Sequence, residues 1–169
     1  MARRIVESVR TGETFIFDDE WTEPDGRVRQ MEHELKGHRS VPRHVHRRTV
    51  QSFEVVSGIL GVQIRGRRWI LRPGERIATG PGEVHAQWNE GAAPARVIER
   101  YDPPLDIEPF FKVLPEAMGG RNPLKRAIFL ADFRAVSAAR GLRRRLTTRL
   151  LAPLGRLLGL SRWYSGLLS

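Results

Sequence analysis

Short apolar or β-branched runs, separated by clusters of glycine, proline and aspartate, fill residues 1–101. Runs of this length with turn-forming residues between them are typical of antiparallel strands. Several runs alternate with a period of two, so Met31, His33 and Leu35 share one predicted strand face. The predicted strands cover 14–17, 28–35, 52–56, 59–64, 68–71 and 95–101. This rhythm predicts a mainly β domain over residues 1–104, an antiparallel sandwich or barrel, which ends at Pro103-Pro104 because prolines cannot continue a ladder.

The chain changes character after residue 104. We expect residues 105–121 to be a linker and residues 122–169 to form an α-helical extension. Asn122-Pro123 predicts a helix start and Gly141 a helix end, with a helix over 124–140 between them. A second, amphipathic helix is predicted beyond Gly141, kinked or split at Pro153. Its leucines recur every four residues at Leu142, Leu146, Leu150, Leu154 and Leu158.

The positive charge of the protein is concentrated in this extension. The net charge is +10, and residues 121–169 carry eleven arginines and lysines but one acid, Asp132, so residues 1–120 are balanced. A basic amphipathic helix at 141–169 could lie on an anionic membrane surface. It could instead pack its leucines on the β domain or on a dimer partner, which is the interpretation we favour. Nucleic-acid binding is the third alternative, and no recognition motif supports it.

Two absences narrow the chemistry and the location. The chain has no cysteine, which excludes disulfides, thiolate metal sites and cysteine nucleophiles. The basic start of the chain is not followed by an apolar run, and no stretch reaches the ~18 apolar residues of a membrane-spanning helix. We therefore expect a cytoplasmic protein, with peripheral membrane binding through the basic extension as an open alternative.

Three histidines and a glutamine form a candidate metal site. His44 and His46 are two residues apart, so in an extended segment both rings leave the same face. Gln51 follows after a possible turn, and His85 follows a Gly-Pro-Gly turn that could bring a second hairpin against the first. Imidazole suits Zn, Fe, Ni and Cu. Because all four ligands are neutral, such a site should favour an anionic small molecule.

The segments 37–58, which contains His44, His46 and Gln51, and 73–89, which contains His85, resemble the paired motifs of the cupin superfamily. The resemblance extends over about residues 25–102. In that family a His-x-His pair is followed by a glutamate ligand and then a glycine, and here Gln51 and Gly58 occupy those positions. The second family motif, Gly-x5-Pro-x-Gly-x2-His-x3-Asn, is matched except that Gly80 replaces the proline. Its matched positions are Gly74, Gly82, His85 and Asn89.

The resemblance implies a single antiparallel cupin β-barrel, the double-stranded β-helix or jelly roll, and a homodimer. It implies a divalent transition metal (Fe, Mn, Ni, Cu or Zn) held by His44, His46, His85 and Gln51. It further implies either a metal-dependent enzyme acting on a small molecule, of the dioxygenase, isomerase or cyclase class, or a non-catalytic binding protein. Gln51 is either a fourth ligand or a residue that hydrogen-bonds to the ligands.

Strand parity and sequence position predict where the residues near the candidate metal site lie. Glu54 should project from the strand face opposite Gln51, so it cannot replace the missing carboxylate without a bulge. His33 is expected in the barrel interior. Trp88 could line the mouth of the pocket or cover the core, and we favour the core. Glu99 lies either in the cavity as an acid–base group or on a solvated edge.

Overall fold

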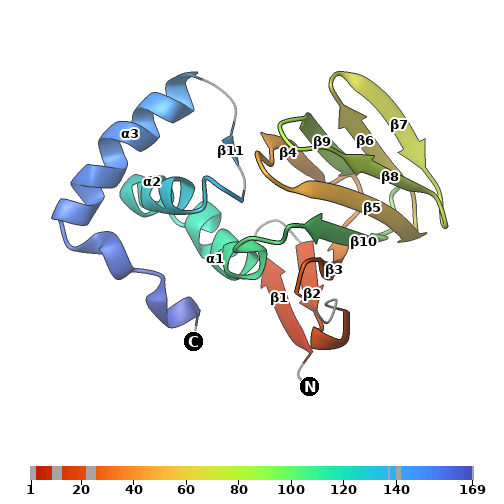
Figure 1. Cartoon of the computed structure of the whole chain (residues 1–169), viewed down its shortest axis with the longest axis horizontal. Coiled ribbons are helices and arrows are strands. Elements are labelled where there is room, and N and C mark those ends of the chain that lie inside the picture. The colour runs from red at the N-terminus through yellow and green to blue at the C-terminus, as the bar shows by residue number, and fades with distance from the viewer. Residues whose placement is uncertain (1–2, 9–12, 22–25, 137, 140–141, 169) are drawn as a thin grey trace.

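The computed structural model describes residues 3–8, 13–21, 26–136, 138–139 and 142–168. Two antiparallel sheets face each other on one side of the molecule, and helices cover the other side (Figure 1). The first sheet contains, in spatial order, β1 (Arg4–Ser8), β2 (Glu13–Phe17), β3 (Arg29–Leu35), β10 (Ala95–Asp102), β5 (Val50–Ser57) and β8 (Arg76–Thr79). The second contains β11 (Ala138–Ala139), β4 (Ser40–Val45), β9 (Val84–Asn89), β6 (Leu60–Ile64) and β7 (Arg67–Leu71).

The predicted β architecture is confirmed in a jelly-roll-like form. Among the described strands the two sheets are not joined by a continuous hydrogen-bond ladder, so they do not close as a barrel. The strands at residues 4–8, 40–45, 76–79 and 84–89 were absent from the predicted set, because polar and basic residues interrupt their alternation. The apolar core between the sheets consists of Leu35, Phe53, Val55, Leu60, Val62, Ile64, Leu71 and Val97.

The segment 105–121, which we expected to be a linker, contains helix α1 (Ile107–Gly119). Its apolar residues recur at helical spacing and bury Ile107 and Phe111 against Phe15 and Phe17 of β2. α1 therefore shares a second apolar cluster with the first sheet, and the helical layer continues the fold of the β domain.

The helix predicted over 124–140 ends earlier. Helix α2 (Pro123–Asp132) starts as expected, since the Asn122 side chain accepts hydrogen bonds from the amides of Leu124 (2.9 Å) and Lys125 (3.3 Å). It stops at Asp132 because Phe133 and Val136 turn back into the second apolar cluster. The predicted helix end at Gly141 lies outside the described residues.

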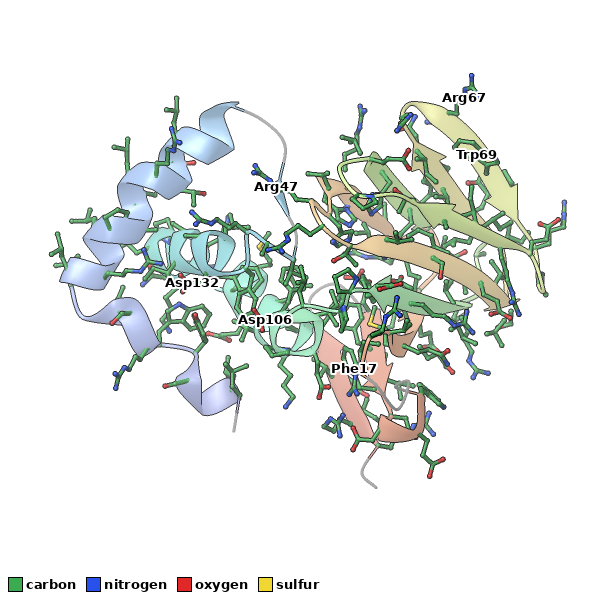
Figure 2. All side chains as sticks on the ribbon, in the orientation of Figure 1. Phe17, Arg47, Arg67, Trp69, Asp106 and Asp132 are labelled. Atoms are coloured by element: carbon green, nitrogen blue, oxygen red, sulfur yellow. The ribbon has the colours of Figure 1, made fainter. Side chains whose placement is uncertain are left out.

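Helix α3 (Leu142–Leu157) continues through Pro153 and is not split there. It packs on α2 through Ala152, which contacts the cluster of Ala127 and Ile128. The short helices η2 (Leu160–Arg162) and η3 (Ser165–Leu167) follow it, and η1 (Asp19–Trp21) lies near the start of the chain. Asp132, at the end of α2 (Figure 2), holds this tail: its carboxylate accepts from Arg156 and from the Tyr164 hydroxyl (2.7 Å).

Candidate metal centre

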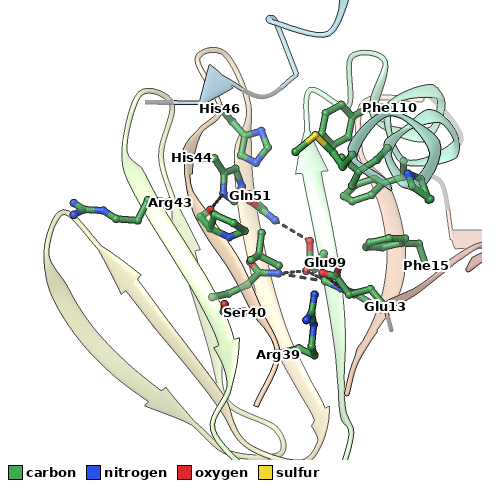
Figure 3. Close-up of a pocket in the computed structure, with 18 of the residues that line it drawn as sticks. Glu13, Phe15, Arg39, Ser40, Arg43, His44, His46, Gln51, Glu99 and Phe110 are labelled. Atoms are coloured by element: carbon green, nitrogen blue, oxygen red, sulfur yellow. Dashed lines mark hydrogen bonds and ion pairs between the residues drawn. The ribbon is translucent and has the colours of Figure 1, made fainter. Parts of the chain in front are cut away.

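The three predicted histidines converge at one end of the space between the sheets. His44 and His85 are register partners on β4 and β9, and His46 follows the end of β4. One ring nitrogen from each lies within 4.8 Å of the other two. The ring centroids of His44 and His85 are 4.2 Å apart, and those of His46 and His85 are 5.2 Å apart. We call these three residues the histidine triad; Figure 3 shows His44 and His46 above Gln51 and Glu99.

Backbone carbonyls fix the tautomer of each triad member. The Nδ1 atom of His44 lies 2.8 Å from the Pro42 carbonyl oxygen, and that of His85 lies 3.0 Å from the Glu83 carbonyl oxygen. His46 makes the equivalent contact with the Val136 carbonyl. A carbonyl only accepts, so these contacts favour the tautomers in which Nδ1 carries the proton and Nε2 keeps its lone pair. Three lone pairs thus face a common space, and the Nε2 of His46 is buried there without a hydrogen-bond partner among the described residues.

The electrostatics of the triad favour the neutral, metal-binding form. Burial, followed by the positive charges that its two partners would carry, lowers the pKa of His44 to about 3. Burial is also the main cause that lowers the pKa of His85 to about 4, and it lowers the pKa of His46. All three imidazoles are therefore neutral at neutral pH, and each has one nitrogen lone pair available, as metal coordination requires.

The Gln51 side chain presents its oxygen to the triad. Its Nε2 donates to Glu99 Oε2 (2.8 Å) and to the Tyr101 hydroxyl (2.9 Å), which fixes the orientation of the amide. Its Oε1 consequently lies 2.9 Å from the Nε2 of His85. Both atoms are acceptors when the Nδ1 of His85 carries the proton, so their lone pairs repel unless a cation lies between them. This donor set fits a divalent transition metal.

A buried carboxylate network lies beneath Gln51 and settles the position of Glu99. Glu99 is 1% exposed, and it accepts hydrogen bonds from His33 (2.8 Å), Gln87 (2.6 Å), Gln51 and Tyr101. Burial alone would lower the pKa of His33, but the carboxylates of Glu99 and Glu13 together raise it to about 9. Burial alone would raise the pKa of Glu99, but the His33 cation and the hydrogen bonds lower it to about 2. His33 is an interior residue, as predicted, and forms an ion pair with Glu99.

Two other predictions about individual residues have opposite outcomes. Glu54 points away from the triad, as parity predicted, and pairs with Arg76 (2.8 Å) and Arg100 (2.9 Å). Trp88 is not a core residue, because its strand turns His85 inward and therefore turns Trp88 outward. There the indole is only partly buried, and the Arg68 guanidinium lies 5.4 Å from its ring centroid.

His44 and His46 of the triad line a cavity of about 280 Å³. Gln51, Glu99 and Tyr101 line its polar part. The opposite wall is apolar and comes largely from α1 and α2, from Phe110, Phe111, Leu114, Met118, Phe129 and Leu130. The sequence interpretation placed the linker at 105–121 and the helical extension at 122–169 outside the site. The signal that could have identified α1 is the helical spacing of its apolar residues, whereas the contact of His46 with Val136 has no sequence signature.

The C-terminal extension also supports the triad through the backbone. β11 pairs with β4, where Ala138 is opposite Val45 and Ala139 is opposite His44. Together with the Val136 carbonyl, this pairing holds both ends of the His44–His46 segment. The extension is thus a structural part of the candidate centre.

Comparisons with known proteins agree with this architecture. The family model described as "Cupin domain" matches residues 31–101. Germin-like protein subfamily T member 2 from Arabidopsis thaliana is 31% identical over 99 residues, which are 55% of this chain and 44% of that protein. The chain therefore spans less than half the length of this curated relative.

Two solved structures share the fold. KdgF from Halomonas sp. superposes with a TM-score of 0.54 at 18% identity, over 64% of this chain and 93% of that one. An RmlC-like cupin from Shewanella frigidimarina NCIMB 400 gives a TM-score of 0.51 at 17% identity, over 63% and 88% of the two chains. The motifs, the jelly-roll topology and the histidine triad lead to one conclusion: this chain contains a domain of the cupin superfamily.

Proposed function

We propose that His44, His46 and His85 hold a divalent transition metal (Fe, Mn, Ni, Cu or Zn), with Gln51 as the fourth ligand. The observation that carries this proposal is the pairing of every triad Nδ1 with a backbone carbonyl, which leaves three Nε2 lone pairs facing one space. The contact between Gln51 Oε1 and His85 Nε2 supports the fourth position.

We propose further that the metal and the cavity act on a small molecule, as a dioxygenase, isomerase or cyclase would. The metal would supply Lewis acidity or a binding site for dioxygen. The chain itself contributes a neutral ligand set, a fixed Gln51 amide and an apolar wall. Tyr101 keeps its proton, because burial and the Glu99 charge raise the pKa of its hydroxyl well above 10.

Metal analysis tests the first step. We expect purified full-length protein, loaded with each of the five metals and then dialysed, to retain about one equivalent of at least one metal. His44→Ala combined with His46→Ala should abolish retention, and Gln51→Ala should weaken affinity about 10–100-fold. His38→Ala, in an exposed loop, is the matched control and should have no effect. A wild-type protein that retains none of the five metals would refute the proposal.

A second candidate function is non-catalytic binding at an anionic membrane surface, and the exposed leucines of α3 favour it. No helix in the described part of the chain can span a membrane. The interpretation that the leucine stripe packs on the β domain is wrong. Ala152 and the partly buried Leu151 pack in the cluster with Ala127 and Ile128, and the other leucines of residues 146–158 face outward. Their exposed fractions are 49% for Leu146, 72% for Leu150, 46% for Leu154, 85% for Leu157 and 63% for Leu158.

Vesicle flotation tests this candidate with the full chain. Binding to phosphatidylserine-containing vesicles, but not to neutral ones, is expected, and Leu150→Gln with Leu157→Gln should reduce it. Equal recovery of both forms would eliminate it. The same leucines could instead cover a second copy, in the homodimer that we also propose. Light scattering tests this, because the dimer should then become a monomer in the double variant.

A further inference from the structure

We propose that the cavity binds an organic carboxylate with a compact apolar body, and that Arg39 binds its carboxylate group. This inference names the ligand class of the proposed metal centre and takes its catalytic meaning from the proposed function. It rests on a different residue, however, and on two features of the cavity that do not depend on the triad.

Arg39 is a cation in the cavity wall that makes no ion pair among the described residues. It lines the cavity, and its Nε is buried without a hydrogen-bond partner among the described residues. Figure 3 shows its guanidinium on the opposite side of Glu99 from His44 and His46. A buried guanidinium nitrogen without a partner is costly unless a ligand supplies the acceptor. A carboxylate does so with two oxygens that match the planar fork of arginine.

The two carboxylates that line the cavity, those of Glu99 and Glu13, already contact other donors. Glu99 accepts hydrogen bonds from four side chains. Glu13 lies 3.4 Å from His33 Nε2 and forms the second half of the His33 ion pair. Neither of these carboxylates makes an ion pair with Arg39 among the described contacts. A divalent ion on the neutral triad would add positive charge to the cavity beside Arg39, which favours an anionic ligand.

The apolar wall defines the rest of the ligand. Phe15, Phe110, Phe111, Leu114 and Met118 surround the space beside Arg39 and the triad. The rings of Phe15 and Phe111 are 4.4 Å apart at their centroids, so they present a continuous aromatic surface. The cavity volume of about 280 Å³ lies at the small end of the ~300–1,000 Å³ of ligand pockets. A single ring or a branched chain attached to the carboxylate fits these limits.

Calorimetric titration with matched probes tests this inference. The probes are phenylacetate, 3-phenylpropionate and 4-methylpentanoate, each paired with its neutral primary amide, and acetate as the carboxylate without an apolar body. They are titrated into metal-free protein and into protein loaded with Zn²⁺. We expect at least one carboxylate to bind about tenfold or more tightly than its amide and than acetate. Arg39→Met should remove that preference.

Arg67→Met is the matched control, because Arg67 is an exposed arginine on β7, far from the helices (Figure 2). It should leave the preference unchanged, and melting curves should show that both variants are folded. Equal binding of acids and amides, no binding of any acid, or a preference that survives in Arg39→Met would overturn the inference. Arg39-dependent binding to protein that retains no metal would refute the proposed function alone, and metal retention without acid preference would refute this inference alone.

Discussion

Replacement of Glu99 by glutamine tests the buried network that supports the candidate centre. Glu99→Gln keeps the shape of the side chain and removes its charge. The three nearest nitrogens, on His33, Gln87 and Gln51, lie 2.6–2.8 Å from its carboxylate oxygens and all donate to it. An amide offers one accepting oxygen and one NH₂ group, so it cannot satisfy all of these donors.

The size of the effect follows from the His33–Glu99 ion pair. The increase of the His33 pKa from 6.5 to about 9 corresponds to about 3 kcal/mol of interaction at 1.36 kcal/mol per pH unit. The charge of Glu99 is the largest favourable cause of this increase, and Glu13 adds to it. A raised pKa stabilises the fold fully below pH 6.5, and this contribution is lost as the pH rises through 9. We therefore expect the cost of Glu99→Gln to be about 3 kcal/mol larger at pH 7 than at pH 10.

Urea unfolding of metal-free protein at pH 7 and pH 10 measures this difference. Glu54→Gln is the matched control: Glu54 pairs with arginines on the outer face, and its loss should cost under about 1 kcal/mol. A free-energy difference for Glu99→Gln that is absent at pH 7, or equally large at pH 10, would refute the ion pair.

The same substitution should weaken metal binding without touching a proposed ligand. Glu99 accepts from the Gln51 amide nitrogen and thereby directs the Gln51 oxygen toward His85. With glutamine at position 99 the Gln51 amide can rotate and present its NH₂ group to the triad instead. We expect a 10–100-fold loss of metal affinity, measured by competition with a chromophoric chelator. An unchanged affinity would show that Glu99 does not orient Gln51.

Three further predictions concern the triad, the β sheet and the basic helix. In metal-free protein the lowered pKa values of the triad should decrease the urea midpoint as the pH falls from 6.5 toward 4, because the unfolded chain binds protons first. A flat profile between pH 6.5 and pH 4 would contradict these pKa values. Gly61→Ala should cost about 1–3 kcal/mol in thermal denaturation, because a Cβ there would lie 2.1 Å from the Trp88 ring; a neutral result would mean that Trp88 is free to move. Leu150→Ala should change the free energy of unfolding by less than about 0.5 kcal/mol, because Leu150 is exposed. Ala152→Leu should cost about 1–3 kcal/mol, because Ala152 is only 2% exposed. The reverse order of the two effects would mean that α3 packs through Leu150.

Local periodicity made much of the β domain predictable. Strand parity alone separated Gln51 from Glu54, and the structure places them on opposite faces of β5. The spacing of His44 and His46 was sufficient to predict rings on one side of an extended segment. Trp88 was misassigned, because a large aromatic side chain can lie either in the core or partly buried on the outer face of a sheet.

The sequence by itself determined the antiparallel β class, the motif histidines and the location of the positive charge, because each depends on residue type and short-range spacing. Only the tertiary structure decided that Glu99 is buried beneath Gln51, that the Val136 carbonyl holds His46, and that α1 and α2 wall the cavity. These contacts join residues 48 and 90 positions apart and depend on how the helices pack on the first sheet. The outward leucines of α3 have the same origin, since the small Ala152 lets that helix approach α2 closely with its other face.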